Sequence, residues 1–189
     1  MESALIVSCT GKSTVFFTEV LNAASISKIA VLPSCGEARR FLLEWDFDLV
    51  IVNAPLRDES GENFARHIAS KAMSQVILTV KNEQFDAISN VCEDDGVLVI
   101  SKPINRVLFW SALSLAKAAR KITKRMQAEN AQLKQKIEDI RIVDRAKLIL
   151  VSHLNMSEKE AHRYIEKQAM DMRSTRRTVA ERILKTYEN

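Results

Sequence analysis

Five polar side chains stand at or just beyond the ends of short apolar runs in the first hundred residues: Ser8, Cys9, Asn53, Thr79 and Lys102. Together they offer hydroxyl, thiol, amide and ammonium groups, but no carboxylate. Mg²⁺ prefers anionic oxygen ligands, and none of these side chains provides one. The set therefore predicts hydrogen bonding, with no bound metal or cofactor.

A second set of residues that could bind a ligand lies near the end of the chain. Arg173, Arg176 and Arg177 gather around Ser174 and Thr175 at the corner between two expected helices. Guanidinium groups, hydroxyls and helix N-terminal amides can together grip a phosphate. The alternative is a solvated surface on which these arginines form ion pairs with nearby acidic residues. The sequence leaves both readings open.

The charge of the chain is divided unevenly. Residues 1–104 carry 9 Lys and Arg against 14 Asp and Glu, whereas residues 105–189 carry 19 against 10, so the net charges are −5 and +9. The basic part is the one to test for a polyanionic partner. Three widely spaced cysteines without a C-x-x-C pair predict reduced thiols. Because no apolar run is long enough to span a bilayer, we expect a cytoplasmic protein.

Five short, β-branched runs position the first set of polar residues. They are Ala4–Val7, Ile29–Leu32, Leu49–Val52, Val76–Val80 and Val97–Ile100. Segments with helical periodicity separate them, which predicts an α/β domain with a doubly wound, five-stranded parallel sheet. Ligands of such sheets bind at the carboxyl ends of the strands, which is where the polar residues stand.

The segment from residue 3 to about 118 resembles the receiver domain of bacterial response regulators. The resemblance rests on Asp-Leu-Val-Ile-Val-Asn at 48–53 with Gly61 beyond it, on Thr79, and on Lys102-Pro103. It implies a receiver-like domain over residues 1–118. In that family an acidic pair and a phosphoacceptor Asp hold Mg²⁺, and here these positions read Ser8, Cys9 and Asn53.

These departures predict a pseudo-receiver, which is a sensory domain that keeps the fold but cannot be phosphorylated. We expect Thr79 and Lys102 to hydrogen-bond Asn53 where family members meet a phosphate. The alternative for Lys102 is an ordinary surface lysine. A regulatory protein or a small molecule bound to this domain could replace phosphorylation as the input signal.

The stretch from Ile104 to His153 contains no Gly or Pro and predicts one continuous helix. Its heptad positions a and d carry Ala116, Ala119, Thr123, Met126, Asn130, Leu133, Ile137 and Ile140. We expect a coiled-coil linker over residues 119–140 that forms a homodimer, with Met126, Asn130, Leu133, Ile137 and Ile140 as the dimer seam. Asn130 favours a two-stranded, in-register pair. The alternative is a solvated single helix between two domains.

The end of the long helix and two short helices predict a small three-helix domain over residues 133–189. Ser157 and Glu160 form the capping-box pattern that opens a helix, and Ser174 is expected to cap the next one. Apolar positions at helical spacing predict the core: Ile142, Val143, Ala146, Ile149, Leu150, Ala161, Ile165, Ala169, Met172, Val179, Ala180, Ile183, Leu184 and Tyr187.

The same segment resembles the ANTAR domain, a small RNA-binding module that follows a coiled coil. The matching blocks are Arg141 to Lys147, Ser157 to Ala161, Tyr164-Ile165, Gln168 to Met170, Arg176 and Val179-Ala180. Leu148 departs from the family, which commonly has Gly there. The resemblance implies a dimeric transcription antiterminator that holds hairpin loops in nascent RNA. We expect RNA contacts from Ala146, Lys147, Arg163, Tyr164, Arg173, Ser174, Thr175, Arg176 and Arg177.

Two other functions stay open. The two short helices and their turn could mimic a DNA-binding helix-turn-helix, and the coiled coil alone could serve a scaffold that binds only protein. Tyr164 could stack on an RNA base or belong to the core. An enzyme is not expected, because the sequence offers no pairing of a nucleophile with a base and no metal-ligand cluster.

Overall fold

The computed structural model describes residues 1–187, which divide into two compact units: residues 1–125, here called the receiver-like unit, and the residues from Met126 onward, here called the three-helix unit. Helix α5 (Arg106–Leu154) begins in the first unit and ends in the second. The prediction of one continuous helix is therefore confirmed. The last two residues of the predicted 133–189 domain lie outside the described residues.

A parallel sheet forms the centre of the receiver-like unit. Among residues 1–187 its strands are β1 (Ser3–Val7), β2 (Lys28–Leu32), β3 (Leu49–Asn53), β4 (Gln75–Lys81) and β5 (Leu98–Lys102). They lie in the order β2-β1-β3-β4-β5, so the predicted doubly wound, five-stranded parallel sheet is confirmed. Because the strand order reverses between β1 and β3, their carboxyl ends border the crevice where such sheets bind ligands.

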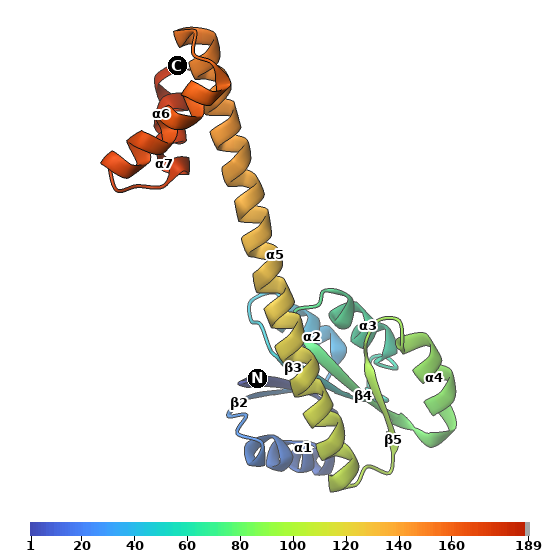
Figure 1. Cartoon of the computed structure of the whole chain (residues 1–189). Coiled ribbons are helices and arrows are strands. Elements are labelled where there is room, and N and C mark those ends of the chain that lie inside the picture. Colours follow the sequence, from blue (N-terminus) through green and yellow to red (C-terminus); the bar gives the residue numbers. More distant parts are fainter. Residues whose placement is uncertain (188–189) are drawn as a thin grey trace. The chain divides into compact units, whose positions relative to one another are not determined.

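Helices cover both faces of this sheet (Figure 1). On one face, α2 (Cys35–Phe41), α3 (Glu62–Ser70) and α4 (Phe85–Cys92), which follows the short 3₁₀ helix η1 (Asn82–Gln84), pack against alternate strand residues such as Leu5 and Val7. On the other face, α1 (Gly11–Ala23) and the start of α5 pack against Ala4 and Ile6. The alternation follows from the two-residue period of a strand.

The start of α5 belongs to the receiver-like core. Phe109, Leu113 and Ala116 are fully or almost fully buried against the sheet. Ala116 was expected in the coiled-coil seam, and this expectation is wrong because its side chain is already covered within its own chain. A helix that packs on a sheet shows the same apolar period as one that packs on a second helix, so the sequence pattern could not separate the two.

An ionic cluster also ties α5 to the sheet. The Asp48 carboxylate, just before β3, accepts hydrogen bonds from the Glu2 amide at 2.8 Å and from Arg120 Nε at 3.2 Å, and it pairs with Lys124 Nζ at 2.7 Å. Burial alone would raise the pKa of Asp48, but these partners hold the pKa well below its usual range. The carboxylate is thus charged in the folded unit.

The three-helix unit is formed by the end of α5, by α6 (Glu158–Asp171) and by α7 (Arg176–Tyr187). The fully buried core side chains come from all three helices and include Ala146, Leu150, Ala161, Ile165 and Ala180. The capping box is present, because Ser157 Oγ accepts from the Glu160 amide while the Glu160 carboxylate accepts from the Ser157 amide. Met172 and Tyr187 were predicted in the core but are exposed.

The turn between α6 and α7 places a different residue at the helix cap from the one predicted. The backbone of Arg173 is left-handed, with φ 48°, and the Ser174 amide donates to the Ala169 carbonyl at 2.9 Å. This closes the end of α6. Thr175 then caps α7, because its Oγ1 accepts from the Thr178 amide at 3.1 Å. The expectation that Ser174 is the cap is wrong.

None of the helices within residues 1–187 combines the length and the apolar character that a membrane-spanning helix needs.

Candidate functional site

The polar residues at the carboxyl ends of β1, β3 and β4 come together in a neutral hydrogen-bond network. Asn53, only 3 % exposed, donates from Nδ2 to Ser8 Oγ at 2.9 Å and to Thr10 Oγ1 at 3.3 Å. Its Oδ1 accepts from Thr79 Oγ1 at 2.9 Å. The expected hydrogen bond from Thr79 is therefore present. Thr10 was not among the predicted site residues, although its place directly after β1 could have indicated it.

Lys102 does not make the hydrogen bond to Asn53 that the sequence suggested. Its Nζ donates to the main-chain carbonyl of Ala54, one residue beyond Asn53. Burial lowers the pKa of the Lys102 ammonium, and the charge of Lys81 lowers it further. Lys102 is half-buried rather than an ordinary surface lysine. Because the Asn53 amide is uncharged, it does not attract the Lys102 ammonium as a carboxylate would.

A cavity of about 540 Å³ opens beside this network. Its lining includes Cys9, Lys12, Asn53 and Lys102, together with apolar side chains such as Phe16. No Asp or Glu lines it, and no cluster of His, Cys, Asp or Glu suited to a metal ion occurs within residues 1–187. The donor set is thus a poor match for the Mg²⁺ that receiver chemistry requires.

Gly61 fixes the approach of α3 to the end of β3. Its φ is +89°, and a Cβ at this position would lie 2.9 Å from Val52 Cγ1. A larger residue would have to push against the strand that carries Asn53. Gly61 therefore helps to hold the network in position without taking part in it.

Three members of the second predicted set, Thr175, Arg176 and Arg177, line a groove of about 540 Å³ in the three-helix unit, whereas Arg173 and Ser174 do not line it. It brings together Lys147 from α5, the cap residue Thr175, and Arg176 and Arg177 from α7. Ile140 and Val143 contribute apolar surface. The groove also includes Lys136, Asp139, Asp144 and His162. Sequence reasoning missed Lys136 and His162 as site residues, because only the fold shows that they line the same groove as Arg176.

Acidic neighbours partly neutralise the groove. Arg177 donates to Asp139 on α5 and to Glu181 on α7, both at 2.7 Å, and the hydrogen bond to Asp139 raises the pKa of Arg177. Arg176 pairs with Glu166 at 3.2 Å. For Arg176 and Arg177 the alternative reading, in which the arginines form surface ion pairs, is therefore correct as a description of the contacts.

The cations of the groove differ in accessibility. The Lys147 side chain is 16 % exposed and pairs with Asp144 at 2.7 Å and Glu158 at 3.5 Å, and the Asp144 contact raises its pKa. The Arg176 side chain is 58 % exposed and, among residues 1–187, pairs with Glu166 alone. Arg176 is therefore the more available cation for a ligand.

Ser174 adds an unsatisfied hydroxyl beside Arg176. Its Oγ is buried without a hydrogen-bond partner among the described residues. Ser174, Thr175 and Arg176 line a second hollow of about 550 Å³. A buried hydroxyl without a partner is unusual and marks a place where a polar ligand would be favourable.

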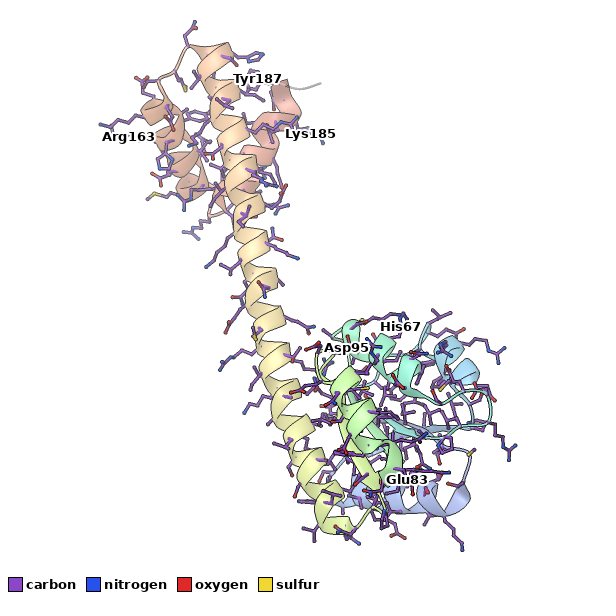
Figure 2. All side chains as sticks on the ribbon, turned by 90° about the vertical axis from the view of Figure 1, so that its right-hand side faces the viewer. His67, Glu83, Asp95, Arg163, Lys185 and Tyr187 are labelled. Carbon is purple, nitrogen blue, oxygen red and sulfur yellow. The ribbon has the colours of Figure 1, made fainter. Side chains whose placement is uncertain are left out.

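The remaining predicted RNA contacts lie apart from the groove. Ala146 is fully buried in the core, so the expectation that its side chain meets RNA is wrong. Arg163 points away from the unit on α6 (Figure 2). Tyr164 is 40 % exposed, which rules out the core position, and Arg173 and Leu148 are also exposed.

The positive charge is distributed differently from what the division into halves suggested. Residues 105–125 carry six Lys and Arg and no Asp or Glu, whereas residues 126–189 carry 13 Lys and Arg against 10 Asp and Glu. Most of the excess thus lies on the part of α5 that belongs to the receiver-like unit, and the three-helix unit is only mildly basic. Local placement of charge, rather than net charge, must explain a polyanion site there.

The predicted dimer seam is an exposed apolar stripe. Met126, Leu133, Ile137 and Ile140 are each between 52 % and 60 % exposed, and Asn130 is exposed among them. A helix stripe of this kind is unfavourable in water without a covering partner.

The chain is similar to known proteins in both units. Residues 131–184 match the ANTAR domain family. The transcriptional regulatory protein PdtaR of Mycobacterium tuberculosis, from strains CDC 1551 and H37Rv, is 29 % identical over 139 residues, which cover 74 % of this chain and 68 % of that protein.

Solved structures resemble the receiver-like fold. The signal receiver domain of a putative Luxo repressor protein from Vibrio parahaemolyticus has a TM-score of 0.58 at 18 % identity, covering 66 % of this chain and 96 % of that one. The signal receiver domain of an HD domain-containing protein from Pseudomonas fluorescens Pf-5 has a TM-score of 0.57 at 17 % identity, covering 65 % and 91 %. At these identities the likeness concerns the fold.

Proposed function

We propose that this chain, an ANTAR response regulator with a receiver-like amino-terminal domain, regulates transcription by antitermination through direct binding of RNA hairpin loops to its three-helix unit. The observation that supports this most is the groove that joins Lys147, Arg176 and Arg177 within the ANTAR-matched residues. Loop bases that are unstacked can meet apolar and planar side chains while their phosphates meet cations.

The ion pairs in the groove are compatible with RNA binding. An exposed ion pair contributes roughly 0–1 kcal/mol, whereas a hydrogen bond to a charged group contributes about 1.5–3 kcal/mol. Replacing the Glu166 carboxylate by an RNA phosphate as the partner of Arg176 therefore costs little free energy. Phosphate contacts also release counterions from the nucleic acid, which adds to the affinity.

An electrophoretic mobility assay tests this function with the full chain. The probes are an RNA with two adjacent hairpins, the same RNA with one hairpin disrupted, and duplex DNA of equal length. We expect the two-hairpin RNA to shift at the lowest protein concentration, because two linked sites gain from their effective concentration. Equal binding of duplex DNA would contradict the proposal, and no binding of any probe would favour a protein-only scaffold.

We also propose that the chain acts as a homodimer through the seam of Met126, Asn130, Leu133, Ile137 and Ile140. Leu133→Lys with Ile137→Lys should weaken the dimer, because it places like charges in a desolvated seam. The matched control, Ala131→Lys with Gln132→Lys, adds the same charge at outward heptad positions. Sedimentation velocity of both variants beside the wild type measures the effect. A monomeric wild type at micromolar concentration would support the single-helix alternative.

Phosphorylation incompetence is the third part of the proposal. Incubation with acetyl phosphate and Mg²⁺ should add no phosphoryl mass, because Asn53 cannot form an acyl phosphate. Asn53→Asp alone should not restore efficient transfer, since Ser8 and Cys9 still provide no anionic metal ligands. Intact-protein mass spectrometry measures the outcome, and a phosphorylated wild type would overturn this part.

A further inference from the structure

We infer that the cavity at the carboxyl ends of β1 and β3 binds a small organic anion, which would act on the receiver-like unit without covalent attachment. The cavity measures about 540 Å³, within the usual range of roughly 300–1,000 Å³ for small-molecule sites. Its lining residues all belong to the receiver-like unit. RNA binding by the three-helix unit does not depend on this site, so either proposal can fail alone.

The charges around the cavity favour an anion. Lys12 and Lys102 line it, and no Asp or Glu does. Neither lysine forms an ion pair with any residue in the range 1–187. Lys102 is half-buried and, within the described part of the chain, donates to the neutral carbonyl of Ala54 alone. A partly buried ammonium without a counter-charge is unfavourable, and a bound anion would relieve this cost.

The neutral network beneath the cavity makes the same site tolerant of negative charge. Asn53 is held by Ser8, Thr10 and Thr79, all uncharged. A carboxylate at position 53 would instead repel an anion and pair with the nearby lysines. The same neutral side chains that offer no carboxylate to a metal ion thus leave the cavity able to accept an anion.

The walls of the cavity indicate that the anion carries an apolar body. Phe16, Phe17, Pro55, Pro103 and Ile104 line it beside the lysines. Ligand sites commonly combine such apolar walls with a few polar groups that fix orientation. A carboxylate or phosphate group on a small ring or alkyl chain has this chemistry, whereas a bare inorganic ion would leave the apolar walls unused.

Cys9 provides a built-in reporter of occupancy. It lines the cavity, its thiol is free and partly exposed, and its Sγ lies 3.7 Å from the Pro55 carbonyl oxygen. The other two thiols, Cys35 and Cys92, are buried, and burial raises the pKa of both. A neutral alkylating reagent should therefore react first at Cys9, and a ligand in the cavity should shield it.

The test measures the rate of Cys9 alkylation by N-ethylmaleimide in the full chain, with peptide mass spectrometry to locate the product. The probes are phenyl phosphate, benzoate, inorganic phosphate and the neutral benzyl alcohol, each at constant ionic strength. We expect phenyl phosphate or benzoate to slow alkylation, by about tenfold when ~90 % of the cavity is occupied. If phenyl phosphate protects better than benzoate, the ligand carries a phosphate group. If benzoate protects better, it carries a carboxylate.

Variants separate a specific site from a general salt effect. Lys102→Gln and Lys12→Gln should each raise the ligand concentration needed for half-maximal protection by about tenfold, as expected for the loss of one charge-assisted hydrogen bond. Asn53→Asp should abolish protection. Lys71→Gln, a change at an exposed lysine outside the cavity, should leave protection as in the wild type. Circular dichroism checks that each variant is folded, and Lys12→Gln, at an exposed residue, serves if Lys102→Gln does not fold.

Three results would overturn the inference. The first is no protection by either organic anion at tens of millimolar. The second is equal protection by benzyl alcohol or inorganic phosphate, which would remove the need for charge or for an apolar body. The third is unchanged protection in the folded lysine variants.

Discussion

The two units of this chain use their polar side chains in opposite ways. In the receiver-like unit, Ser8, Asn53 and Thr79 are buried and bonded to one another. In the three-helix unit, Arg176 and Glu166 are exposed or half-exposed and pair at the surface. A buried polar group that loses its partner costs about 1–3 kcal/mol, whereas an exposed ion pair contributes roughly 0–1 kcal/mol. The first set therefore specifies the fold, and the second can exchange partners.

This difference explains how the receiver-like unit keeps its fold with only neutral side chains bonded to one another at the ends of β1, β3 and β4. Asn has nearly the shape of Asp, so it can occupy the end of β3 while neutral hydroxyls satisfy its amide. The surface pairs of the other unit leave their cations available to a phosphate. Substitutions in the buried network should therefore lower the free energy of unfolding, whereas substitutions in the groove should lower the affinity for RNA.

The largest stability effect should come from Asp48→Asn. This change leaves Arg120, whose side chain is 11 % exposed, without its charged partner, and the loss should be about 3 kcal/mol. Urea unfolding followed by tryptophan fluorescence reports on this unit, because Trp45 and Trp110 both belong to it. Asp95→Asn is the matched control, since it breaks the more exposed pair with Arg66 and should cost less than ~1 kcal/mol. Equal losses would contradict the contrast between buried and exposed pairs.

The Asp48 effect should also depend on pH. The folded-state pKa of Asp48 lies below its ordinary value, so its contribution is fully present above the unfolded pKa of about 3.9 and is lost as the pH falls toward the folded pKa. The free-energy gap between the wild type and Asp48→Asn should be constant from roughly pH 5 to 8 and narrow below about pH 4. Unfolding curves over this range measure it, and a gap that widens toward low pH would reverse the assigned sign.

A smaller but clear loss is expected for Thr79→Val. The change leaves Asn53 Oδ1 buried without its donor, which should cost about 1–3 kcal/mol. Thr18→Val serves as the control, because Thr18 is only half-buried and its hydroxyl has no partner within the described part of the chain. The same fluorescence assay applies. A loss no larger than that of the control would mean that the network is not structural.

The smallest stability effect should come from Arg176→Ala. It removes one exposed ion pair and should change the free energy of unfolding by less than ~1 kcal/mol. The helical circular dichroism transition measures it. A loss of about 2 kcal/mol or more would mean that Arg176 stabilises the fold as much as the buried network does. This result would contradict the contrast between the two units.

Local signals predicted most of the architecture. The five β-branched runs became strands, and the capping box of Ser157 and Glu160 formed as expected. Such features depend on a few neighbouring residues, so the sequence contains all that decides them. The hydrogen bond from Thr79 to Asn53 also followed, because the carboxyl ends of adjacent parallel strands must meet.

Two of the predictions that are wrong concern choices between near-equivalent partners. Lys102 and Asn53 line the same cavity, but the Lys102 ammonium donates to the main-chain carbonyl of Ala54, the residue next to Asn53. Ser174 and Thr175 are adjacent hydroxyl residues, and the left-handed Arg173 decides which of them caps α7. The pair of Arg177 with Asp139 joins residues 38 positions apart, so only the folded unit shows it.

The salt dependence of RNA binding tests the central claim most directly. Each phosphate that a protein neutralises on single-stranded RNA adds ~0.7 to the slope of log K against log salt concentration. Arg176→Ala with Arg177→Ala should flatten this slope by about 1 to 1.5. Arg40→Ala with Lys71→Ala removes the same charge from exposed residues of the receiver-like unit and should leave the slope unchanged. Equal flattening by both pairs would mean a diffuse charge effect, and an unchanged slope in the Arg176 and Arg177 variant would contradict the assignment of the groove as the RNA site.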